Sequence, residues 1–165
     1  MFLFYQDLKM HENKEIKLPK LVVKESQIHS SGVFAAEPIK EGQKIIEYKG
    51  EKIPGAEGDR RSELDEKLTY IFILNDKYDI DGSVDGNDAR LANHSCNPNA
   101  YTDVIDDKIW IIADRDIMGG EEITYDYSFD ADELEECYCG SEKCRGHMND
   151  PDDESTKKLL KEKLN

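Results

Sequence analysis

Short runs of apolar residues that alternate with polar ones recur along most of the chain. This period-two pattern predicts strands at residues 21–23, 33–35, 44–48, 69–74, 78–80, 101–104, 108–113 and 122–127. Turn-forming residues separate these segments, at Ser30-Ser31-Gly32, Asn75-Asp76, Asp106-Asp107 and Gly119-Gly120. Many short strands with frequent turns are typical of a mostly β domain.

Helical periodicity is confined to three short segments. Residues 59–68 are charged and carry leucines four positions apart, which predicts a surface helix capped by Asp59. Residues 87–91 fit a single helical turn. Residues 153–164 place leucines on one side of a helix, and either an amphipathic helix or a solvated tail accounts for them.

The length of 165 residues predicts one domain that can bury a core. We expect a polar leader over residues 1–18 and the main domain over residues 19–130. A cysteine-rich segment follows at residues 131–149, and a charged tail or helix occupies residues 150–165. No internal repeat divides the chain.

The formal net charge of −15 argues against direct binding to nucleic acids or membranes, whose surfaces are anionic. We expect a basic partner, such as a Lys/Arg-rich peptide, although an acidic surface also serves solubility alone. No apolar run approaches the roughly 20 residues of a membrane span, and Met1–Tyr5 is too short for a signal peptide core. An intracellular location follows: cytoplasmic for a bacterial protein, nuclear or chromatin-associated for a eukaryotic one.

The cysteines form the first candidate site. Cys137, Cys139 and Cys144 place three thiols within eight residues, one ligand short of a tetrahedral structural zinc site. Cys96 is the remaining cysteine, and a fourth thiolate from that distant segment would fasten the C-terminal part to the domain. His94 and His147 are rival fourth ligands, and reduced thiols without a metal are the alternative.

Aromatic residues form the second candidate site. Tyr70 and Phe72 share one face of a predicted strand, and Tyr125 and Tyr127 share one face of another. Ordinary β-sheet packing accounts for such pairs, since strands are rich in aromatics. The polar dipeptide Asn93-His94, next to a candidate metal ligand, favours a functional site.

Five blocks of the sequence resemble the SET-domain protein lysine methyltransferases that carry a post-SET zinc motif. In chain order they are Ile28-His-Ser-Ser-Gly-Val-Phe-Ala35, Glu47-Tyr-Lys-Gly-Glu51, Ala89-Arg-Leu-Ala-Asn-His-Ser-Cys-Asn-Pro-Asn99, Gly120-Glu-Glu-Ile-Thr-Tyr-Asp-Tyr127 and Cys137-Tyr-Cys-Gly140 with Cys144-Arg-Gly146. The match runs from about residue 19 to residue 148. The resemblance implies a mostly β SET fold of small curved sheets with a knot-like crossing, plus a C-terminal zinc loop.

The resemblance also implies the reaction, which is methyl transfer from S-adenosylmethionine (SAM) to a lysine of a basic protein, with a histone as one candidate. Matching the family's cofactor motifs gives SAM contacts at His29, Ser30, Ser31, Tyr70, Arg90, Asn93, His94 and Tyr138. The catalytic and substrate-channel positions are Tyr127, Tyr125, Tyr70 and Phe72, with Tyr125 at the position that controls how many methyl groups are added. The zinc ligands are Cys96, Cys137, Cys139 and Cys144.

One position departs from the family's pattern. Ser30 stands where the first glycine of a Gly-x-Gly motif is usual, and a positive φ there would strain it. A catalytically silent SET fold that acts as a binding module is therefore the alternative to an enzyme. Among products, Tyr125 favours mono-methyllysine, because a hydroxyl there takes up the room that a methylated amine needs.

Overall fold

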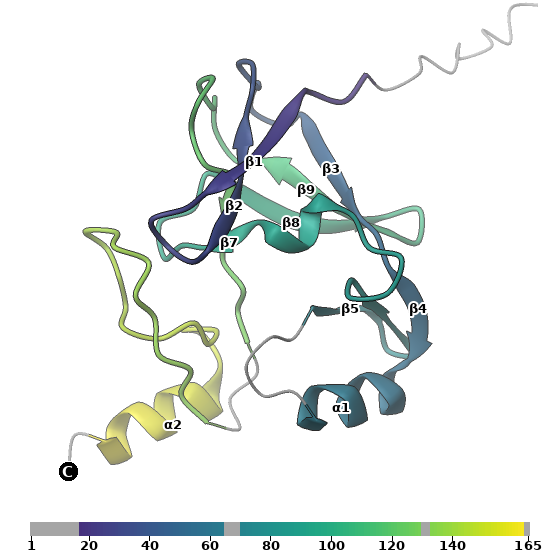
Figure 1. Cartoon of the computed structure of the whole chain (residues 1–165). Coiled ribbons are helices and arrows are strands. Elements are labelled where there is room, and N and C mark those ends of the chain that lie inside the picture. The colour runs from purple at the N-terminus through teal and green to yellow at the C-terminus, as the bar shows by residue number, and fades with distance from the viewer. Residues whose placement is uncertain (1–16, 65–69, 130–132, 164–165) are drawn as a thin grey trace, which may run out of the picture.

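The computed structural model describes residues 17–64, 70–129 and 133–163, which form several small sheets and two short helices (Figure 1). The strands are β1 (Leu21–Glu25), β2 (Ser31–Ala35), β3 (Lys44–Tyr48), β4 (Glu51–Pro54), β5 (Ile71–Asn75), β6 (Tyr78–Asp81), β7 (Asn93–His94), β8 (Ala100–Ile105), β9 (Lys108–Ala113) and β10 (Thr124–Tyr125). The helices are α1 (Gly55–Leu64), the 3-10 turn η1 (Asp88–Leu91) and α2 (Glu154–Lys163). The prediction of a mostly β fold of small sheets is confirmed.

Three of the sheets are antiparallel and one is parallel. β1 pairs with β2, β9 lies between β3 and β8, and β6 lies between β4 and β5. β7 pairs in parallel with β10, which aligns Asn93 with Thr124 and His94 with Tyr125. Two of the five blocks that carry the resemblance, Ala89–Asn99 and Gly120–Tyr127, therefore meet side by side, although about thirty residues of chain separate the paired positions.

The core forms around β9, whose residues from Ile109 to Ala113 are all buried. A central strand is covered on both faces, so its sequence is a continuous apolar run instead of an alternating one. The largest side chains that are almost fully buried include Ile39, Ile45, Ile109, Ile111, Ile117 and Ile123.

Several elements differ from the sequence predictions. Ser31 and Gly32, predicted as part of a turn, begin the strand β2, and β7 was not predicted as a strand. The helix predicted from Asp59 begins at Gly55, so Asp59 lies inside α1 and the proposed cap is wrong; residues 65–68 of that prediction lie outside the described residues. Inside this helix, Gly58 approaches β6 so closely that a side chain there would collide with Asp79. β4 was not predicted, since its sequence, Glu-Lys-Ile-Pro, has only one buried residue.

The remaining predictions concern the ends of the chain and β10. β10 covers only Thr124–Tyr125 of the predicted strand 122–127, and Glu122 adds an isolated bridge to Phe34. At the C-terminal end, α2 confirms the helix and not the solvated tail. The leader up to residue 16 lies outside the described residues. Within the described ranges, no helix has the length and apolar character that crossing a membrane requires.

Candidate functional site

An aromatic wall lies against the β7–β10 pair. The ring centroids of Tyr125 and Tyr127 are 4.9 Å apart, and Phe72 from β5 lies 6.1 Å from Tyr125. Tyr48 and Phe129 extend the wall, at 5.3 Å from Phe72 and from Tyr127 respectively. The structure thus brings together Phe72, Tyr125 and Tyr127, three of the four predicted catalytic and channel residues, and their roles stay predictions. Tyr48 was missed, although it lies in the Glu47–Glu51 block that carries the resemblance.

The hydroxyl of Tyr127 donates a hydrogen bond to the backbone carbonyl of Ala92, at 2.9 Å. Burial, followed by the nearby Tyr70 and Glu122, raises the pKa of Tyr127 above its ordinary value. Burial also raises the pKa of Tyr125. Both phenols are therefore neutral at physiological pH, and a neutral hydroxyl can donate and accept hydrogen bonds.

The buried side chain of Asn93 is held by two acceptors. Its Nδ2 donates to the backbone carbonyl of Ser31 at 2.9 Å and to Oε1 of Glu122 at 2.7 Å. The carboxylate of Glu122 also accepts from the Ser26 hydroxyl, at 2.8 and 2.9 Å to its two oxygens. Both amide protons of Asn93 are engaged, which leaves Oδ1 as the atom that can accept a hydrogen bond from a ligand. Sequence reasoning missed Glu122 and Ser26, because nothing local marks them as partners of Asn93.

The other candidate cofactor residues differ in burial: His94 is buried, whereas Ser31 and Tyr70 are half-buried. His29 and Ser30 are exposed, and Ser30 has a φ of 27°, in the left-handed region. The guanidinium of Arg90 lies 5.5 Å from the ring centroid of Tyr70. Tyr138 is 79% exposed and its hydroxyl donates to Glu136, so the structure leaves this ring in solvent.

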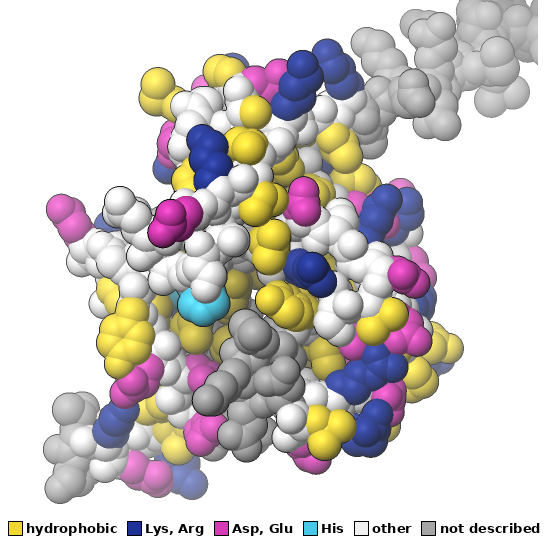
Figure 2. All heavy atoms as spheres, in the orientation of Figure 1, with side chains coloured by type: hydrophobic (Ala, Val, Ile, Leu, Met, Phe, Trp, Pro, Cys, Tyr) yellow, Lys and Arg dark blue, Asp and Glu magenta, His cyan; other side chains and the backbone are white. Residues whose placement is uncertain are grey.

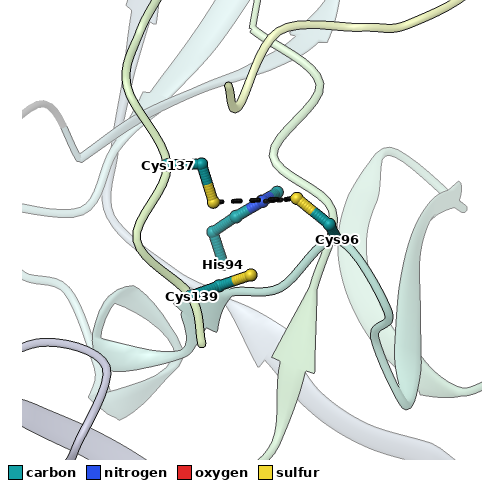
Figure 3. Close-up of side chains that lie close together, drawn as sticks. All are labelled: His94, Cys96, Cys137 and Cys139. Atoms are coloured by element: carbon teal, nitrogen blue, oxygen red, sulfur yellow. Dashed lines mark hydrogen bonds between the residues drawn. The ribbon is translucent and has the colours of Figure 1, made fainter. Parts of the chain in front are cut away.

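Three cysteines and a histidine gather beside this site (Figure 3). The donor atoms of His94, Cys96, Cys137 and Cys139 all lie within 4.8 Å of one another, and the cysteines are free thiols. The sulfurs of Cys96 and Cys137 are 3.6 Å apart. Two thiolates bound tetrahedrally to one zinc, at about 2.3 Å each, lie about 3.8 Å apart. The cluster therefore has a spacing that suits zinc.

Cys144 lies next to this cluster, with its sulfur 3.5 Å from the backbone carbonyl of Cys137. Burial opposes ionisation of the neighbouring Cys139, but backbone N–H groups of Cys96 and Ser141 and the adjacent thiols lower the pKa of Cys139 to about 7. The thiolate is the form that binds metals, but burial raises the pKa of Cys96 and of Cys137, so Cys139 is the one of these three thiols that ionises most readily.

The hydrogen bonds of His94 bear on whether it is a ligand. The backbone N–H of Tyr127 donates to His94 Nδ1 at 3.1 Å, and burial lowers the pKa of His94 to about 4. A neutral ring whose Nδ1 accepts carries its proton on Nε2. Nε2 faces the Cys96 sulfur at 3.3 Å, so it donates to that sulfur instead of binding a metal. This arrangement favours Cys144 as fourth ligand over His94; His147, although buried, is not part of the four-donor group.

Comparisons of the sequence with known proteins identify the family of this chain. Residues 30–128 match the family model described as SET domain. The chain is 40% identical over 151 residues to Histone-lysine N-methyltransferase ATX2 of Arabidopsis thaliana, over 86% of this chain and 14% of that protein. It is 40% identical over 152 residues to Histone-lysine N-methyltransferase SETD1B of Homo sapiens, over 87% of this chain and 8% of that protein.

A third relative is Histone-lysine N-methyltransferase, H3 lysine-4 specific, of Schizosaccharomyces pombe, which is 42% identical over 134 residues. This match covers 75% of the chain and 14% of that protein. The chain thus spans at most about one seventh of the length of these three relatives.

Proposed function

The chain belongs to the SET domain family, and we propose that it is a SAM-dependent protein lysine N-methyltransferase. The observation that carries this proposal is the meeting of Asn93 with the aromatic wall at the β7–β10 pair. The amide of Asn93, a polar group that a charged cofactor could contact, and the apolar rings that a lysine chain could pack against adjoin there. The relatives named histone-lysine N-methyltransferases support the same reaction.

The residues around Asn93 fit SAM. The free Oδ1 of Asn93 can accept a hydrogen bond from an ammonium group such as that of SAM, and the backbone at His29, Ser30 and Ser31 lies on the adjoining segment. We assign further cofactor contacts to Tyr70, Arg90, His94 and Tyr138. When bound, SAM supplies the methyl group on its sulfonium.

The aromatic wall prepares the lysine for methylation. An ordinary lysine has a pKa of about 10.4, so about one amine in a thousand is neutral near pH 7. Phe72, Tyr125 and Tyr127 remove water from the amine, which lowers its pKa and favours the neutral nucleophile. The Tyr127 hydroxyl stays protonated and orients the amine, and such positioning can lower the barrier by several kcal/mol.

We propose that Cys96, Cys137, Cys139 and Cys144 bind one structural zinc ion. In this arrangement residues 131–149 form the post-SET zinc motif and residues 19–130 the SET domain. Four thiolates would close the coordination sphere, so the metal has a structural and not a catalytic role. The ion would hold the C-terminal loop against β7, which precedes Cys96.

The proposed substrate is a lysine of a basic protein, with a histone as first candidate because the relatives are named for histone lysines. The net charge of −15 favours a basic partner. On the face in Figure 2, acidic and basic side chains are intermixed, so no patch of one sign marks the binding surface there. A nuclear location would follow for a eukaryotic histone methyltransferase.

A catalytically silent binding module is the second candidate, and the positive φ of Ser30 favours it. A non-glycine residue in this region is strained, which would weaken SAM binding if the cofactor requires the same backbone. Transfer of labelled methyl from SAM to core histones separates the two functions. We expect transfer by the wild type and at least about a hundredfold less by Tyr127→Phe. If the wild type binds SAM but transfers no methyl group, the enzyme proposal is wrong and the binding module is the function.

A further inference from the structure

A bidentate ion pair joins two segments of the chain. One is the loop Cys137–Gly146, here called the cysteine loop, and the other is Thr124–Tyr127, here called the catalytic strand. Nη1 and Nη2 of Arg145 donate to the two carboxylate oxygens of Asp126 at 2.6 and 2.9 Å. The side chains are only 20% and 27% exposed, so solvent screens this pair less than a surface pair. Arg145 also donates to the backbone carbonyl of Asn149 at 3.4 Å, which anchors it within the C-terminal loop.

The sequence positions of the two partners give this pair its significance. Asp126 lies between Tyr125 and Tyr127, whose side chains form the aromatic wall. Arg145 directly follows Cys144. A displacement of the cysteine loop therefore reaches the backbone of the catalytic strand through a single residue on each side.

A second contact supports the same junction from β7. His94 Nδ1 lies 3.5 Å from the Asp126 carboxylate and accepts the backbone N–H of Tyr127. Its Nε2 faces the Cys96 sulfur. The segment from Tyr125 to Tyr127 is thus held between the two stretches of chain that supply the thiols.

We propose that Arg145 is a positioning residue that makes zinc occupancy of the cysteine cluster fix the two catalytic tyrosines, through its ion pair with Asp126. The proposal rests on the proposed methyltransferase function. In-line transfer is sensitive to placement, since a shift of about 1 Å can cost about a hundredfold in rate. Loss of the pair therefore lowers kcat, while the zinc ligands and the contacts of Asn93 remain.

The kinetic test compares Arg145→Met, Asp126→Asn and the double variant with wild type. Each single change is expected to lower kcat at least about tenfold, with the SAM dissociation constant and one zinc per chain retained. The double variant is expected to lose no more than the worse single variant, because both remove the same pair. Arg115→Met, which breaks an exposed pair with Glu121, is the matched control with unchanged kcat. Additive losses, an unchanged kcat or a loss of zinc in Arg145→Met would overturn the proposal.

A second measurement does not depend on methyl transfer. Hydrogen exchange of the Tyr127 amide, which bonds to His94, is expected to accelerate in wild type when a chelator removes zinc. In Arg145→Met the exchange is expected to be fast already with zinc bound. Slow exchange in that variant contradicts the proposal, whether or not the wild type transfers methyl groups. If Arg145→Met does not fold, Arg145→Lys keeps the charge without the bidentate geometry and is judged by the same two outcomes.

Discussion

The carboxylate of Glu122 accepts a hydrogen bond of 2.7 Å from Nδ2 of Asn93, and this bond sets the orientation of the buried Asn93 amide. A carboxylate can only accept, so Nδ2 must point toward Glu122 and Oδ1 toward the opposite side. The Ser26 hydroxyl donates to the same carboxylate and holds it in place. The acceptor that we assign to SAM binding is therefore oriented by two residues outside the cofactor motifs.

Glu122→Gln should weaken SAM binding about tenfold, because a glutamine can also donate and leaves the Ser31 carbonyl as the one acceptor that enforces the orientation of Asn93. Isothermal titration calorimetry with SAM measures this change. Glu121→Gln alters a neighbouring carboxylate that pairs with Arg115 at the surface, and it should leave the affinity within about twofold. Equal affinities of Glu122→Gln and wild type would show that the Glu122 bond does not orient the cofactor site.

Ser30→Gly should stabilise the fold by about 0.5 kcal/mol. Relief of a left-handed backbone gains about 1–2 kcal/mol, and the added freedom of glycine in the unfolded chain offsets part of it. Urea denaturation measures the difference. Ser31→Gly provides the matched control, since Ser31 lies in the extended strand β2 and a glycine there should destabilise by roughly 0.5–1 kcal/mol. A destabilised Ser30→Gly would mean that the serine is not strained.

The zinc assignment predicts opposite outcomes at Cys144 and His94. Wild-type protein should contain one zinc per chain by elemental analysis, and Cys144→Ser should lose most of it together with SAM affinity, because Tyr138 lies on the same loop. His94→Gln should retain the metal, since the glutamine amide can still donate to the Cys96 sulfur. Zinc retained in Cys144→Ser but lost in His94→Gln would make His94 the fourth ligand.

Tyr125 should limit the product to mono-methyllysine, with some dimethylation at long times. Its ring is buried in the aromatic wall, where the hydroxyl can hold the amine or a water beside it. Tyr125→Phe should raise di- and trimethylation, as measured by mass spectrometry of a peptide with a single lysine. Ready trimethylation by the wild type would remove this role from Tyr125 without affecting the methyltransferase proposal.

Local patterns were sufficient for much of the fold. The hairpin of β8 and β9, the strand β3 and the 3-10 turn follow from short-range preferences, because alternation and turn residues act within a few positions. β4 could not be predicted in this way, since its polar residues form a strand through pairing with β6. The close approach of Gly58 in α1 to Asp79 in β6 is likewise a contact between residues far apart in sequence, which local patterns do not reveal.

By itself the sequence determined the spacing of three thiols, the pairs of aromatics on single strands and the ordered blocks that resemble a family. Only the tertiary structure decided which groups meet: Asn93 with Glu122, Asp126 with Arg145, and the Cys96 sulfur with that of Cys137. These partners lie 19 to 41 residues apart. The physical reason is that side-chain chemistry and backbone preference are local, whereas the distance between two atoms depends on the packing of every element between them.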